Sequence, residues 1–316
     1  MKQKRRFATG ADPSLAATET LKHICELYMA HEGAKLRTAE WRKSVLDRHI
    51  YPTLGARPIA EIKRSEVVRL LDQIEEGSGP VMATQTLAVL RKVMNWHATR
   101  SDDFLSPIVR GMARTKPSER ARERVLTDDE LRQVWQSANG HGVYGSYLRF
   151  LLLTAARRSE VAGMSWAEIN GGDWTLPAAR NKTKLDLIRP LSRAAQDILE
   201  GLPTAVGFVW LSDGGARAIS DFGGFKRELD AASGVKDWRL HDLRRTARSL
   251  MSRAGVPTDH AERCLGHVIG GVRGVYDRHE YRAEKQQAYE ALAGIIERIV
   301  SGTQAGGVQL KGRGKR

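Results

Sequence analysis

The first third of the chain carries apolar residues at the spacing of amphipathic helices. Stripes at residues 21–28 and 41–46 predict two helices, and residues 51–62 interrupt them with two prolines and a glycine. Ser65 is placed to cap a third helix, which Gly77 ends, and a fourth carries the apolar positions of 87–97. The pattern predicts a compact helical domain over the first ~110 residues.

A second pattern begins near residue 125. Thr127 and Glu130 have the spacing of a capping box, and a strongly apolar helix follows over 147–155. The runs DWTLPAA and LDLIRPLS are short, are bounded by the turn-forming NGG and NKTK, and predict strands. Helical patterning returns at 192–199 and 221–229 and from His241 onward. We therefore predict a fold that is mainly α with a small antiparallel β-sheet.

These patterns divide the chain into five parts. A basic flexible tail covers 1–16, a helical domain 17–112 and a basic linker 113–124. A larger domain covers 125–301, and 302–316 is a Gly-rich basic tail that we expect to be disordered. The linker, with Pro117 and five arginines or lysines, suits either a solvated tether or a strap along a phosphate backbone.

The net charge of the chain limits the classes of partner that it can bind. Lys and Arg outnumber Asp and Glu by 51 to 37, which gives a net charge of +14. A basic chain suits a polyanion, and because no apolar run approaches the ~20 residues of a membrane span, nucleic acid is favoured over a membrane. The basic N-terminus lacks the apolar region of a secretory signal. Cys25 and Cys264 stand alone, and HExxH and GxxxxGK[ST] are absent, so we expect a reducing cytoplasm, no metal and no cofactor.

Three segments place cations or imidazoles beside apolar residues. In LLLTAARRSEV, Arg157 and Arg158 follow a core-like run, and neighbours ~100° apart on a helix cannot both face solvent equally. In HDLRRT, His241 and Arg244 share one helical face, which suits either phosphodiester chemistry or simple phosphate contact. His267 is the first side chain after the helix end that Gly266 predicts, where a structural hydrogen-bonding role is the alternative.

Over nearly its whole length the sequence resembles the tyrosine recombinases, or phage integrases, above all those of temperate phages and genomic islands. TAARRSEVAGMSW resembles the family's TGxRxSE box, HDLRRT its HxxR box, and LGH with a tyrosine nine residues later its final box. The resemblance implies a helical core-binding domain and a mixed α/β catalytic domain. It also implies the catalytic residues, namely Arg157, Lys182, His241, Arg244, His267 and the nucleophile Tyr276.

Two of these assignments carry qualifications. The family's lysine lies eight residues before a Pro-Leu pair, which selects Lys182, with Lys184 as the competing candidate. Ala155 stands where the family has glycine, a small-for-small change that we expect to be tolerated. The chain also lacks room for a separate arm-binding domain before the core-binding one, so simple core sites or a truncated chain are expected.

The implied function is site-specific DNA recombination through a covalent 3′-phosphotyrosyl intermediate, which integrates or excises a mobile element. Implied partners are double-stranded attachment sites, three further copies of the chain in a tetrameric synapse, and accessory DNA-bending or excision factors. The stripe Leu292, Ile295, Ile296 and Ile299 is then expected to dock on a neighbouring protomer. The alternatives are a type IB topoisomerase-like enzyme and a non-catalytic regulator that uses a helix-turn-helix near Gly255 to Pro257.

Overall fold

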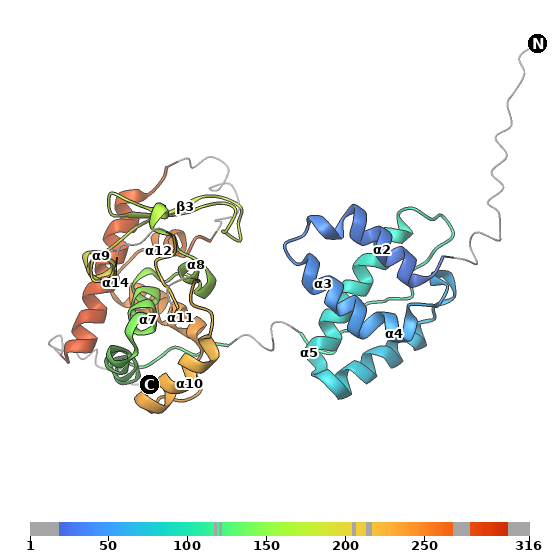
Figure 1. Ribbon diagram of the computed structural model, residues 1–316, viewed down its shortest axis with the longest axis horizontal. Coiled ribbons are helices and arrows are strands. Elements are labelled where there is room, and N and C mark those ends of the chain that lie inside the picture. Colours follow the sequence, from blue (N-terminus) through green and yellow to red (C-terminus); the bar gives the residue numbers. More distant parts are fainter. Residues whose placement is uncertain are drawn as a thin grey trace, which may run out of the picture. The chain divides into compact units, whose positions relative to one another are not determined.

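The structure is a computed structural model that describes residues 19–116, 119, 122–203, 207–212, 217–267 and 279–302. The chain divides into two compact units, residues 1–121 and 122–316, each with its own hydrophobic core. In Figure 1 the first unit runs from blue to cyan and the second from green to red. The described helices include none that is long and apolar enough to cross a membrane.

The first unit is helical, as its apolar stripes predict. It contains α2 (Leu21–His31), α3 (Ala39–Val45), a π-helical turn (Leu46–Ile50), α4 (Tyr51–Leu54) and α5 (Arg64–Ala98). Thr20 caps α2 by accepting from the backbone N–H of His23. The Tyr51–Leu54 segment, which we expected to interrupt the helices, is helical with a proline in its first turn.

The long helix α5 contains a break, and the break is not where the sequence placed it. We expected Ser65 to cap this helix and Gly77 to end it. Lys63 is the N-cap, and the helix runs past Gly77 to Gly79, whose φ of 82° and ψ of 165° are not helical. Pro80 then opens the second half, since proline fits the first turn of a helix. Both predicted helices are present, but the break between them lies at Gly79, two residues after the expected position.

The second unit surrounds a nearly apolar helix. Its helices are α6 (Asp128–Ser137), α7 (Gly142–Thr154), α8 (Arg158–Ala162), α9 (Arg193–Glu200), α10 (Phe222–Ser233), α11 (Leu240–Arg253), α12 (Thr258–Cys264) and α14 (Arg282–Ser301). The side chains of α7 are buried over most of its length, and α11, α14 and α9 pack around it (Figure 1). The predicted capping box opens α6, because Thr127 accepts from the Glu130 N–H and Glu130 accepts from the Thr127 N–H.

A small sheet forms one edge of this unit. It joins β1 (Ile169–Asn170), β2 (Asp173–Leu176) and β3 (Leu187–Pro190), antiparallel and in sequence order. Gly171 and Gly172 make the β1–β2 turn with positive φ, which glycine adopts at low cost. The predicted mainly α fold with a small antiparallel sheet is confirmed.

The final helix, α14, packs into the core of its own unit. We expected Leu292, Ile295, Ile296 and Ile299 to form a stripe for a neighbouring protomer. In the single chain all four are buried in the core of their own unit, and the Ile299 carbonyl accepts from Arg132 Nε at 2.8 Å. Docking in trans would require this helix to leave that core, so the single chain does not offer the stripe as a free surface.

Candidate active site

Arg244 is the centre of the candidate site. It lies on α11 with only 4% of its surface exposed, although it carries a permanent charge. Its Nη1 donates to the Ala155 carbonyl at 2.6 Å, and its Nη2 donates to the Leu265 carbonyl at 2.7 Å. Nη2 also lies 3.3 Å from His267 Nε2. One guanidinium therefore joins three segments that are far apart in sequence.

The surroundings of Arg244 lower the pKa of its guanidinium but leave the group charged at neutral pH. Burial is the largest cause, and the positive charges of Arg157 and Arg189 add to it. Together they lower the pKa of Arg244 to about 10. The group therefore stays charged at neutral pH and lies among other cations, an arrangement suited to an anionic ligand.

Arg157 reaches the same place from the start of α8. Its backbone N–H donates to Glu160 Oε2 at 3.1 Å and its Nη1 to Oε1 at 2.6 Å. The sequence left open which of two neighbouring arginines turns inward. Arg157 is the half-buried one, whereas Arg158 is exposed and its guanidinium lies 4.9 Å from the Phe222 ring centroid.

Glu160 and Arg189 form a buried ion pair that sequence reasoning missed. Glu160 Oε2 accepts from Arg189 Nη2 at 2.7 Å, and the two side chains are 3% and 0% exposed. Burial alone would raise the pKa of the Glu160 carboxyl, but Arg189 and Arg157 outweigh it and lower the pKa below 4.5. In the sequence, Glu160 directly follows the RRS triplet and Arg189 lies in a short strand. Neither position by itself indicates that the two residues form a pair.

His267 is held between an acid and Arg244. As expected, Gly266 adopts the left-handed conformation, with φ 68°, and an added Cβ would meet Leu187 Cδ2 at 2.4 Å. His267 Nδ1 lies 2.5 Å from Glu262 Oε2. These contacts fit a ring that donates from Nδ1 to Glu262 and accepts at Nε2 from Arg244.

His241 faces a pocket of about 550 Å³ beside this cluster. Partial burial lowers the pKa of His241 below 6.5, and the charges of Arg245 and Arg244 add to the effect. The pocket lining is basic and aromatic, comprising Arg157, Arg158, Lys226, Trp238, Arg239 and His241 together with Phe222, Leu240 and two small residues. Such a lining suits an anionic group attached to a flat or apolar one.

One predicted site residue lies away from the observed cluster, and the predicted nucleophile lies outside the described residues. Lys182 lies on the exposed connection between β2 and β3, and within the described ranges it makes no hydrogen bond or ion pair. Lys184, its competitor, has a φ of 57° in the same connection. Tyr276 lies outside the described residues, as do Arg273 and Arg278. No cluster of metal ligands occurs among the residues that the structure describes.

The structure thus combines a helical unit with a mainly helical second unit that carries a small sheet and a buried cationic cluster. Residues 124–282 match the phage integrase family, and residues 21–102 match the phage integrase central domain. The chain therefore belongs to the phage integrase family of tyrosine recombinases, as its motifs predicted.

Individual relatives agree. Prophage integrases IntA and IntZ of Escherichia coli K12 are each 26% identical, over 272 and 275 residues and 83% and 82% of this chain. The chain spans 65% and 66% of the length of these two relatives. A lambda integrase tetramer bound to a Holliday junction matches with a TM-score of 0.65 and 18% identity, over 89% of this chain and 86% of that one. That likeness concerns the fold.

Proposed function

We propose that this chain is a site-specific DNA recombinase that cleaves and rejoins DNA through a covalent phosphotyrosyl intermediate. One observation carries the proposal: the buried Arg244 guanidinium joins the Arg157 segment to His267, so the three sequence boxes converge on one cationic centre. The family membership and the net charge of +14 support DNA as the substrate. The proposed partners are attachment-site duplexes and three further copies of the chain in a synapse, with accessory factors acting on the DNA.

In the proposed reaction the Tyr276 hydroxyl attacks a scissile phosphorus. The tyrosyl oxygen forms a bond to phosphorus, the bond to the 5′-oxygen breaks, and a 3′-phosphotyrosyl link remains. Because an unperturbed tyrosine has a pKa of about 10, its proton must be removed as it attacks, and His241, with its lowered pKa, is mainly neutral and able to accept it.

The developing charge falls on the non-bridging oxygens. Arg157 and Arg244 are assigned to these oxygens, since forked guanidiniums bind them without a metal. His267 is assigned a hydrogen bond to the same phosphate, for which Nε2 must carry a proton and donate to a phosphate oxygen in place of its contact with Arg244. Lys182 donates the proton to the leaving 5′-oxygen. A 5′-hydroxyl of a partner duplex then reverses the reaction, which gives strand exchange with no cofactor.

The proposed reaction divides the tasks between the two parts of the chain. We assign DNA binding to the helical unit within 17–112 and chemistry to 125–301, in the cytoplasm where the DNA lies. In the described structure the linker arginines pair with carboxylates: Arg114 with Asp72 and Glu75, and Arg124 with Glu130. A role for them along a phosphate backbone would require DNA to replace those carboxylates.

Capture of a covalent adduct tests the proposal. A pool of nicked duplexes with a randomised core is incubated with the protein, and adducts are separated on a denaturing gel and sequenced. We expect an adduct that Tyr276→Phe abolishes. Tyr281→Phe is the matched control, because Tyr281 lies five residues on and stacks its ring under Arg263, 3.6 Å from the guanidinium carbon.

The other outcomes discriminate the alternatives. Binding of the duplexes without any adduct would favour a regulator, and supercoil relaxation without strand exchange would favour a topoisomerase. An adduct that survives Tyr276→Phe would overturn the assignment of the nucleophile.

A further inference from the structure

Asp242 lies between His241 and Arg244 in the first turn of α11, and its side chain is 0% exposed. A buried carboxylate requires partners, because burying an isolated charge costs several kcal/mol. Its Oδ1 accepts from Arg245 Nη1 at 2.5 Å, and its Oδ2 accepts from the Arg239 backbone N–H at 2.9 Å. Both partners lie on or beside the same helix.

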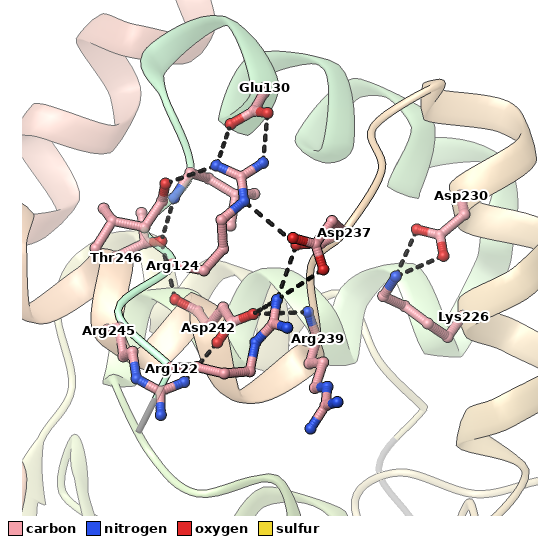
Figure 2. Close-up of polar contacts among 12 residues, drawn as sticks. Arg122, Arg124, Glu130, Lys226, Asp230, Asp237, Arg239, Asp242, Arg245 and Thr246 are labelled. Carbon is pink, nitrogen blue, oxygen red and sulfur yellow. Dashed lines mark hydrogen bonds and ion pairs between the residues drawn. The ribbon is translucent and has the colours of Figure 1, made fainter. Parts of the chain in front are cut away.

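The third partner comes from far away in sequence. Arg122 Nη2 lies 3.5 Å from Asp242 Oδ2, and Figure 2 shows the guanidinium pointing at the first turn of α11. Arg122 opens the segment 122–126, here called the strap, through which the chain enters the second unit. The strap thus begins on the carboxylate that separates two proposed site residues.

The other end of the strap is fastened to the same turn. The Leu126 N–H donates to Thr246 Oγ1 at 3.0 Å, and that hydroxyl donates to the Asp242 carbonyl at 2.9 Å. Leu126 and Thr246 are both buried, so these bonds are shielded from water. Side chain and main chain of Asp242 are therefore each tied to one end of the strap (Figure 2).

The loop before α11 completes the attachment. The Asp237 carbonyl accepts from Arg122 Nη2 at 2.9 Å and from Arg124 Nε at 3.3 Å. Asp237 has a φ of 50°, a left-handed conformation that costs a non-glycine residue about 1 kcal/mol. Arg124 also forms a forked pair with Glu130 at the start of α6. The strap is thus held by the loop, by α6 and by α11.

We propose that Asp242 and Arg122 are positioning residues, which fasten the strap to α11 and so hold His241 and Arg244 in register for DNA cleavage. The proposal rests on the proposed function. Asp242 touches no reacting atom in it and does not line the pocket; its carboxylate holds the rotation and axial position of the turn. Because a misplacement of ~1 Å can cost a catalytic group about a hundredfold in rate, loosening this turn should be visible in cleavage.

The first test measures single-turnover cleavage at saturating DNA, with a duplex captured in the adduct experiment. Arg122→Ala and Asp242→Asn are each expected to slow cleavage about tenfold or more. Each change also removes a contact of its own, Arg122 with Asp237 and Asp242 with Arg245, so the double variant should be slower than either single one. Its loss should still be smaller than the product of the two single losses, because the Arg122–Asp242 contact is lost in both. Saturating DNA separates this effect from any loss of affinity.

Arg253→Ala is the matched control. Arg253 joins the last turn of the same helix to Asp128 with two bonds of 2.7 and 2.9 Å, away from His241 and Arg244. Because this ion pair is about half exposed, Arg253→Ala should change the melting temperature little and leave the cleavage rate within about twofold. Equal rates for Arg122→Ala and Arg253→Ala would overturn the proposal.

A second measurement does not depend on cleavage. Arg245 and Arg244 on its own helix and Arg157 at the N-cap of α8 lower the pKa of His241, and the carboxylate of Asp242 raises it. Arg158, Lys226 and Arg239 line the same pocket as His241. Asp242→Asn should therefore lower that pKa in an NMR titration, and Arg122→Ala should shift the ring signals of His241 more than Arg253→Ala does. If the wild type forms no adduct, the proposed function fails while this titration still decides the attachment: unmoved His241 signals in both variants would overturn it.

Discussion

Ala155 shows what a single backbone conformation does for the site. Its φ of 48° and ψ of 25° are left-handed, and its carbonyl accepts from Arg244. We expected an alanine in the family's glycine position to be tolerated because both are small. The size argument was incomplete, since the position requires a positive φ that costs an alanine about 1 kcal/mol and a β-branched residue more.

Removal of the Glu160 carboxylate should strongly destabilise the second unit. Glu160→Gln leaves Arg189 buried and charged without a counterion, which is expected to lower the free energy of unfolding by about 3 kcal/mol at pH 7. Urea denaturation monitored by circular dichroism measures the loss. Glu200→Gln, at an exposed carboxylate paired with Arg193, is the control and should change little.

The effect of Glu160 has a defined pH dependence. Its folded pKa is lowered below 4.5, so its contribution is complete above that pH and is lost as the pH falls through the folded value. The stability difference between wild type and Glu160→Gln should therefore shrink below about pH 4.5. A difference that stays constant down to acid unfolding would contradict this pairing.

Local spacing identified some site residues and could not identify others. His241 and Arg244 were predictable because three residues on one helix bring them to one face. Glu160, Arg189 and Asp242 were not, because each owes its position to a partner 29 to 120 residues away. Pairings of that kind depend on tertiary packing, which no local pattern encodes.

At the scale of elements, two glycine substitutions test the position of the break in α5. They lie two residues apart and are expected to change stability in opposite directions. Gly79→Ala forces a side chain into φ 82° and is expected to cost about 1–3 kcal/mol, although space for the Cβ is open. Gly77→Ala lies within the helix, also in open space, and should stabilise it by about 1 kcal/mol. Thermal unfolding of both variants measures the two shifts, and a stabilising Gly79→Ala would contradict the break.

The helix boundaries also show which structural details the sequence patterns could predict and which they could not. The capping box of Thr127 and Glu130 and the left-handed Gly266 were predictable because their hydrogen bonds and torsions are local. Two glycines close to Pro80 give almost the same sequence signal, so the break was assigned to Gly77 instead of Gly79. The apolar stripe of α14 predicted a buried face correctly but could not name the surface that buries it.

At the scale of the whole molecule, the net charge of +14 predicts DNA binding that is strongly dependent on salt. Each neutralised phosphate adds about −0.9 to the slope of log K against log[salt]. Arg158→Ala, which removes an exposed cation from the pocket, should reduce the magnitude of that slope by about 1. Arg193→Ala, which removes an arginine already paired with Asp197 and Glu200, should leave the slope unchanged in filter-binding titrations. Equal slopes for the two variants would remove the pocket from the DNA-binding surface.

The burial of Arg244 has a consequence for the lifetime of the protein. Folding brings Arg157, Arg189 and Arg244 close to the carboxylate of Glu160, so positive charge exceeds negative charge among these four described residues. An anion that binds only the folded state stabilises it by mass action. With the proposed phosphate ligand bound, the chain should therefore resist unfolding and proteolysis better than the free chain does. Its abundance in a cell should then follow the supply of the proposed DNA sites.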